Sequence, residues 1–291
     1  MVTGALWLIL GITGAVSWLA ALTARPVVRG LVLGLGLTFI LEGVNFMARG
    51  PVVAVCGAVL TFLLLGRDRL PAMVALLSYG GLMALSLDST LRQDLFMVTP
   101  AFRLPTLHVP DIAWNDLLTG TLILAVPQAA LTLGNAIIAT ANEHNSLFPR
   151  RSVTVRLLAL DHGLMNLAAA PLGGVPMCRG AGGMAGHIRF GARTGGALVI
   201  LGALLLGLAL FYSDSVATLF RLFPAPVLGV ILFFGGVELA SSIENDGGRA
   251  DRIVQVVTAG VALWNPGAAY LAGLLLYHSA RRGLVRLGDS N

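Results

Sequence analysis

The sequence predicts an all-α integral membrane protein, a polytopic helical bundle with inverted repeats. Three observations lead to this fold class. Of the 291 residues, 56% are hydrophobic and only 11% are charged, whereas a soluble domain has about 25% charged residues. The apolar residues fall in long runs, and one Gly-rich segment that contains arginines interrupts them. These features exclude a soluble globular protein.

A helix needs about 20 apolar residues to cross a bilayer, and fewer where other helices bury it. The runs that qualify are 3–22, 26–44, 51–66, 70–87, 117–139, 153–170, 196–212, 226–243, 252–264 and 267–281. We therefore expect about 10 spans, and the Gly-rich segment at 173–190 adds a re-entrant strand and half-helix. The first run lacks a basic leader region, so we expect a full span there and not a cleaved signal peptide.

The charges predict how the spans are oriented. All 19 basic residues are Arg, and most lie in connections that the expected threading places on one side. The long loop at 88–116 is mildly acidic and falls on the other side. Among the basic positions outside this loop, Arg49 is the one exception to the rule that they lie on the basic side. Because basic loops face the cytoplasm, we expect an inner (plasma) membrane protein with a cytoplasmic C-terminus. The bilayer explains the net charge of +5 without nucleic acid as a partner.

An internal repeat is visible in two apolar runs, RPVVRGLVLGLGLTFILEG at Arg25–Gly43 and APVLGVILFFGGVELA at Ala225–Ala240. The corresponding positions are Pro26 with Pro226, Gly30 with Gly229, and Glu42 with Glu238. Each copy precedes a hairpin of two further runs, and the threading gives the copies opposite orientations, as inverted-repeat transporters require. Chance similarity between Gly- and Leu-rich spans is the alternative.

The repeat divides the chain into three parts. Residues 1–87 form the remainder of the first repeat, 88–116 form an extracytoplasmic loop, and 117–285 form the second repeat with a broken-helix site. The first repeat has no counterpart of the Gly-rich segment. We therefore expect either that N-terminal spans are missing from this sequence or that the chain is a shortened relative.

The Gly-rich segment reads GGVPMCRGAGGMAGHIRFGARTG at Gly173–Gly195. Irregular backbone at membrane depth is tolerated only where it is buried in protein or lines a wet cavity, and interrupted spans of this kind bind substrates in transporters. We expect an extended approach that includes Pro176, and then a helix that opens over Met177–Gly183. The first N–H groups of such a helix can bind an oxyanion.

Arg179 adds a permanently charged group that can clamp oxyanion oxygens in a bidentate manner. The alternative is that the glycines serve close helix packing and that Arg179 pairs with a nearby carboxylate such as Asp161.

A second motif, PQAALTLGNAIIA, covers Pro127–Ala139. Pro127 in the middle of a span frees a carbonyl and can kink the helix. Gln128, Thr132 and Asn135 are uncharged polar groups along one side of the next two turns. They suit hydrogen bonds to a ligand, and their alternative role is to hydrogen-bond between helices.

Three ionisable groups in apolar surroundings are candidates for coupling: Asp161, His162 and Glu238. Ionisable groups within spans are costly and indicate function by default, and His titrates near neutral pH. A salt bridge or a place at the membrane edge is the alternative.

The two motifs together resemble the molybdate transporter family, which is related to SulP-type sulfate permeases. The resemblance covers essentially the whole chain, but family members are longer and begin with further spans. It implies a core-and-gate architecture with substrate held between two facing half-helices. The residues that it implies for substrate binding are Gln128, Thr132, Asn135, Pro176, Met177, Cys178, Arg179, Gly180, Ala181, Gly182 and Gly183.

Two departures from relatives refine this resemblance. Family members often have His at the position of Arg179, which puts the role of its side chain in question but not that of the backbone amides. The chain also ends without the cytoplasmic regulatory domain typical of SulP permeases, which favours the molybdate branch.

We therefore expect a secondary transporter of tetrahedral oxyanions, molybdate first and sulfate second, that works by alternating access without a cofactor. Uptake of a dianion against a negative-inside potential is costly, so a proton or another cation is the expected coupling partner. An enzyme is not expected, because the sequence has no nucleophile–base set, metal cluster or haem motif. A metal site or disulfide is not expected from the two cysteines, Cys56 and Cys178, which lie far apart without a CxxC or His pairing. Another transported anion, a truncated non-transporting subunit and a homodimer stay open.

Overall fold

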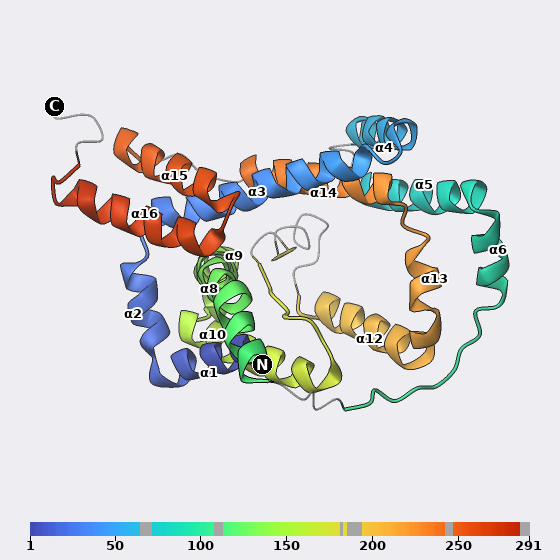
Figure 1. Cartoon of the computed structure of the whole chain (residues 1–291), viewed down its shortest axis with the longest axis horizontal. Helices are drawn as coiled ribbons and strands as arrows, with labels where there is room; N and C mark the ends of the chain where they lie inside the picture. Colours follow the sequence, from blue (N-terminus) through green and yellow to red (C-terminus); the bar gives the residue numbers. More distant parts are fainter. Residues whose placement is uncertain (65–71, 108–112, 181–182, 185–193, 242–246, 286–291) are drawn as a thin grey trace. The chain divides into compact units, whose positions relative to one another are not determined.

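A computed structural model describes residues 1–64, 72–107, 113–180, 183–184, 194–241 and 247–285 (Figure 1). Every regular element in these ranges is helical, and they contain no strand. The prediction of an all-α protein is therefore confirmed for the described residues.

The helices follow the apolar runs of the sequence closely. The first part of the chain forms α1 (Val2–Thr13), α2 (Ala15–Leu22), α3 (Arg25–Met47), α4 (Pro51–Leu64), α5 (Ala72–Leu87) and α6 (Ser89–Phe96). The middle forms α7 (Trp114–Thr119), η1 (Gly120–Ala125), α8 (Val126–Leu131), η2 (Thr132–Ala139), α9 (Thr140–Leu147), η3 (Pro149–Arg151), α10 (Val155–Ala169) and η4 (Ala170–Leu172). The last part forms α12 (Gly196–Phe211), η5 (Ser213–Ser215), α13 (Val216–Phe220), α14 (Ala225–Ser241), α15 (Arg249–Ala262) and α16 (Pro266–Arg281).

Among the described residues, two continuous helices are long and apolar enough to cross a membrane, Arg25–Met47 and the 34-residue run Trp114–Leu147. Three sharply bent helix pairs raise this number to five if each pair is one span. The pair α1 and α2 replaces the straight span expected at 3–22, because Gly14 adopts φ +76° and the axis turns by 95°. Helices α4 and α14, with 14 and 17 residues, are shorter than a full span. The count of ten spans stays a prediction.

The described chain forms two compact units, each built from separate stretches of sequence. Unit 1 contains Met1–Leu37, Thr106–Gly186 and Leu239–Asn291, and unit 2 contains Thr38–Pro105 and His187–Glu238. Both units draw on both proposed repeats. The division at residues 88 and 116 stays a prediction.

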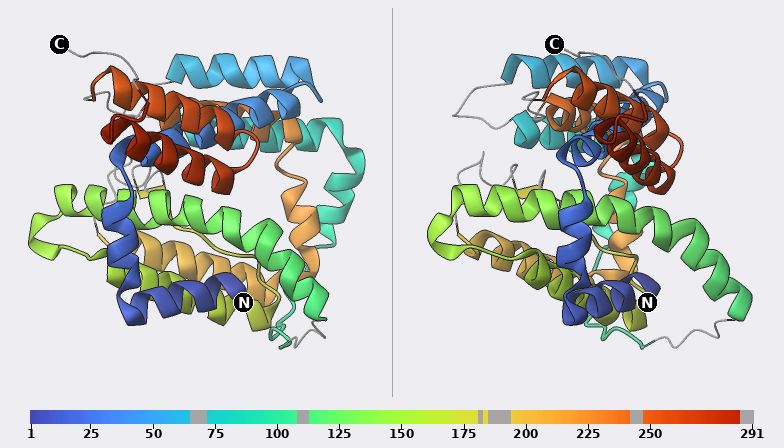
Figure 2. Two further views of the ribbon diagram at one scale, coloured as in Figure 1. Left: turned by 60° about the vertical axis from the view of Figure 1, so that its left-hand side comes forward. Right: turned by 90° about the vertical axis from the view of Figure 1, so that its left-hand side faces the viewer.

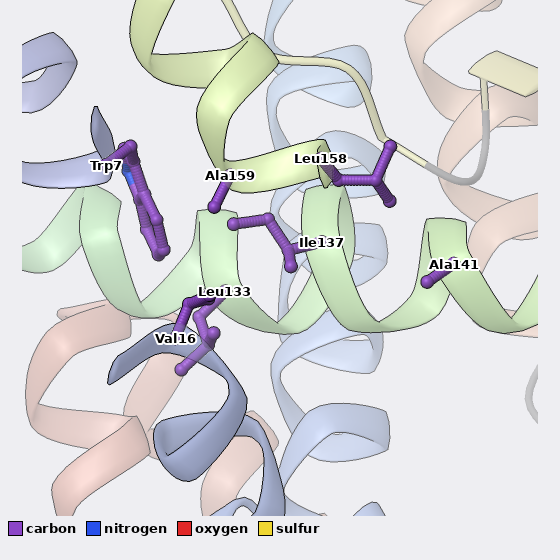
Figure 3. Packing of buried hydrophobic residues seen from close by; sticks show 7 residues of the cluster. All are labelled: Trp7, Val16, Leu133, Ile137, Ala141, Leu158 and Ala159. Carbon is purple, nitrogen blue, oxygen red and sulfur yellow. The ribbon is translucent and has the colours of Figure 1, made fainter. Parts of the chain in front are cut away.

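In unit 1, α1, α2, η2, α9 and α10 share one apolar core (Figure 3). Its members are Trp7, Val16, Leu133, Ile137, Ala141, Leu158 and Ala159. Helices α1 and α10 cross at Gly4 and Gly163, where a Cβ on either glycine would lie within 3 Å of the other helix. Small residues that let two backbones approach in this way are typical of helix packing in membranes.

The first half of α3 also belongs to unit 1 and packs on the last two helices. Val27 lies in a buried cluster with Val254 of α15, and a Cβ on Gly30 would meet Thr258 at 2.5 Å. The equivalent part of α14, in unit 2, packs on α4 and α5. There, Val227 forms a buried cluster with Ala54 and Leu76.

Much of the apolar surface is exposed in the isolated chain. Helix α12 has no buried residue, and its Leu198 and Val199 are 62% and 72% exposed. Soluble proteins rarely present continuous apolar surfaces of this kind. The surface of α12 therefore indicates contact with lipid or with other apolar helices.

Candidate functional site

One long helix carries the second motif, and its backbone is partly π-helical. Segments α7 to α9 follow one another without a break in Figure 2, and η1 and η2 are the two π-helical stretches within them. Pro127 is the second residue after η1; it lacks an N–H donor, and a wider turn accommodates such a loss. η2 begins at Thr132 and includes Asn135. π-Helical segments within α-helices are frequent at functional sites.

The Gly-rich segment leaves α10 through a left-handed turn at Gly173, which has φ +73°. From Gly174 to Gly180 the backbone has no regular structure, and Gly183 and Met184 are the described residues that return to helix. The prediction that a helix begins at Met177 is therefore wrong: residues 177–180 are not helical. The extended approach expected for Pro176 stays a prediction.

Asn166 fixes the irregular backbone at Met177 through hydrogen bonds. The Met177 N–H donates to Asn166 Oδ1 at 2.8 Å, and Asn166 Nδ2 donates to the Met177 carbonyl at 3.0 Å. The same amide nitrogen donates to the carbonyl of His162 at 2.9 Å. Asn166 is buried and satisfies both backbone groups of Met177, as a neighbouring strand would. The N–H of Met177 is thus already used within the protein.

Gly180 brings the segment against η2. A Cβ built on Gly180 would lie 2.5 Å from Asn135 Nδ2, so only glycine fits without moving that amide. The Cys178 thiol lies beside the Thr132 hydroxyl. Two of the three polar residues predicted in the second motif therefore meet the Gly-rich segment. Gln128, the third, is half-buried in α8.

Arg179 forms an ion pair with Asp161 of α10, between Arg179 Nη2 and Asp161 Oδ2. The same group donates to the Leu158 carbonyl at 3.4 Å. The pairing proposed as the alternative role of Arg179 is thus the arrangement in this structure. Both side chains are partly exposed, at 37% and 54%.

The Gly-rich segment and η2 each contribute buried polar atoms without a described partner. Thr132 Oγ1, Asn135 Oδ1 and Arg179 Nε are all buried and have no hydrogen-bond partner among the described residues. Buried polar atoms are nearly always paired. Three such atoms from two facing segments indicate a place where a polar ligand or water can bind.

The three coupling candidates lie in different surroundings. His162 is buried, and its ring packs edge-on against Trp7 at 6.0 Å between centroids, within the α1–α10 contact. Asp161 forms the ion pair with Arg179. Glu238 is an exposed residue of α14 in unit 2. Their role in coupling stays a prediction.

Of the predicted site residues, Ala181 and Gly182 lie outside the described residues. Asn166 was not predicted. Its signal in the sequence is its place four residues after His162, which puts both on one face of α10. Within the described ranges, no group of three His, Cys, Asp or Glu side chains could hold a metal ion.

The long apolar helices and the exposed apolar surface of α12 are those of a helical membrane protein. Residues 120–239, which contain most of the site, match the family described as "Molybdate transporter of MFS superfamily". The resemblance to the molybdate transporter family that rests on the two motifs is therefore confirmed. This family is one of membrane transporters and not of enzymes.

Three similar proteins are also named molybdate transporters, and they match this chain over different lengths. Molybdate transporter 2 of Arabidopsis thaliana is 29% identical over 94% of this chain and 69% of its own length. Molybdate transporter 1 of the same plant is 36% identical over 57% of this chain and 36% of its own length. Molybdate transporter 1 of Chlamydomonas reinhardtii is 38% identical over 59% of this chain and 34% of its own length. The chain thus matches about two thirds of one relative and about a third of the other two.

Proposed function

We propose that this chain is a secondary transporter of tetrahedral oxyanions, with molybdate as the first candidate and sulfate as the second. The observation that carries the proposal is the meeting of Gly180 with Asn135, which brings the Gly-rich segment onto η2. Both motifs that resemble molybdate transporters come together at this contact.

The chemistry around the contact suits an oxyanion. Arg179 carries a fixed positive charge and a buried Nε–H, and the buried Thr132 hydroxyl can donate a hydrogen bond. The Asn135 amide can present either its oxygen or its nitrogen. Hydrogen bonds from charged donors are stronger than those from neutral donors, and both kinds are available here to an anion. No covalent step is required, because the substrate leaves the protein unchanged.

Matching contacts support an inverted repeat for alternating access. The start of α3 packs on α15 and α16, and the start of α14 packs on α4 and α5. In each case the helix that opens one repeat packs on the hairpin of the other. Such an exchange is what two copies in opposite orientations would produce.

The membrane potential opposes uptake of an anion and so favours a coupling ion. Each negative charge moved inward against 100 mV costs about 2.3 kcal/mol, and molybdate and sulfate carry two. We propose a proton or another cation as the coupling ion, with Asp161, His162 and Glu238 as candidate carriers. The location that fits is the inner membrane, with the C-terminus in the cytoplasm.

Uptake of labelled molybdate into proteoliposomes that contain the purified chain tests the proposal, with unlabelled sulfate as competitor and protein-free liposomes as the blank. We expect saturable uptake that an inward proton or cation gradient increases. Saturable sulfate uptake without molybdate uptake would change the substrate. Absence of saturable uptake of either anion would contradict the transport function of this chain and favour a non-transporting subunit.

A further inference from the structure

We propose that the Asp161 carboxylate is a built-in competitor of the anion, which holds Arg179 until an oxyanion replaces it. The inference rests on the proposed function and adds the regulation of the same site. Arg179 of the Gly-rich segment pairs with Asp161 of α10.

The geometry allows an exchange of partners. Asp161 binds one terminal nitrogen of the guanidinium, and the Nε–H is left buried without a described partner. A guanidinium has five N–H donors in a planar fork. An oxyanion that uses two of them would have to displace the carboxylate or lie beside it, and two negative groups at that distance repel each other.

Because the pair is partly exposed, exchanging one partner for another costs little free energy. Both side chains are partly exposed, so water or an anion can replace either partner. Ion pairs at such positions contribute little to folding stability. A fully buried pair would resist exchange, because separating it would leave uncompensated charge.

Competition and simple orientation of Arg179 by Asp161 predict opposite changes in molybdate affinity when Asp161 is replaced. If Asp161 competes with the anion, Asp161→Asn frees the guanidinium and tightens molybdate binding by about two- to fivefold, the range of a half-exposed pair. If Asp161 only orients Arg179, the same change weakens binding.

Equilibrium binding of labelled molybdate to the purified chain measures this difference. The control is Asp214→Asn, which breaks the ion pair between Asp214 and Arg103 in the other unit; the Asp214 carboxylate, at 57%, is about as exposed as that of Asp161. We expect that control to leave the molybdate Kd unchanged. Asp161→Glu, which keeps the charge, should bind like the wild type.

A double-mutant cycle shows whether the effect passes through Arg179. The gain from Asp161→Asn should fall by at least half in an Arg179→Gln background, and this double variant also remains informative if Asp161→Asn alone folds poorly. An equal gain in both backgrounds, or weaker binding by Asp161→Asn, would overturn the competition. Wild-type protein that binds neither molybdate nor sulfate would instead overturn the proposed function, and this inference with it.

Discussion

Asn166 binds both backbone groups of Met177, with its side-chain oxygen 2.8 Å from the Met177 nitrogen and its side-chain nitrogen 3.0 Å from the Met177 oxygen. A helical side chain thus takes the place of a neighbouring strand. It fixes the backbone of the Gly-rich segment just before Cys178 and Arg179 and so positions the part of the segment that meets η2.

Replacing Asn166 by Leu should weaken both the fold and the site. The change leaves two backbone groups of Met177 unpaired, which costs about 1–3 kcal/mol per buried group. We expect a lower midpoint of thermal unfolding and a higher molybdate Kd. Asn145 offers a matched control, because its side chain binds both backbone groups of Val153 in the same way, at 2.7 and 2.9 Å. Asn145→Leu should lower stability but leave the Kd unchanged; equal effects on Kd would show that Asn166 has only a structural role.

Gly180→Ala should weaken anion binding without unfolding the protein. The added Cβ would lie 2.5 Å from Asn135 Nδ2, so the amide has to turn away or the segment has to move. Overpacking of this kind costs about 1–3 kcal/mol, which corresponds to roughly a five- to hundredfold higher Kd. Gly202→Ala in α12, where a Cβ meets nothing within 4 Å, is the control. An unchanged Kd for Gly180→Ala would place the anion elsewhere.

Cys178 can report on occupancy, because the chain has only one other cysteine, Cys56. In a Cys56→Ser variant, Cys178 is the single thiol, and its exposed position allows reaction with a maleimide. A bound oxyanion beside Thr132 should slow this reaction in a saturable manner. The opposite variant, Cys178→Ser, leaves Cys56 as the reporter in α4, and its reaction rate should not depend on molybdate. Equal protection of both thiols would point to a global change and not to a local site.

The start of the 88–116 loop should be sensitive to acid. Asp88 caps α6 and binds Thr90 and Arg221, and these hydrogen bonds, that from Thr90 foremost, hold the pKa of its carboxyl well below the usual value of 3.8. Because the folded-state pKa is the lower one, the stabilisation is complete above about pH 4–5 and declines as the pH falls through the unfolded pKa. The difference in thermal midpoint between wild type and Asp88→Asn should therefore be constant near neutral pH and shrink toward pH 3. A difference that stays constant down to pH 3 would contradict the assignment.

Several features of the fold follow from local sequence properties. The apolar runs predicted helices because apolar length and composition act within one segment, and α3 and α14 fall within a few residues of the expected positions. Bends are harder to predict. Gly14 lies in an apolar run whose length and composition predict one straight span. Its left-handed backbone depends on how α1 and α2 pack.

The sequence by itself determined the class of protein, the two motifs and the family resemblance, because composition and motif spacing do not depend on tertiary contacts. It left two partners open for Arg179, an anion or a carboxylate. The tertiary structure places Asp161 against Arg179 and gives the N–H of Met177 to Asn166. These pairings join residues that are 18 and 11 positions apart on separate segments. They depend on how the segment after Gly173 folds back along α10, and only the packing of the whole unit decides that path.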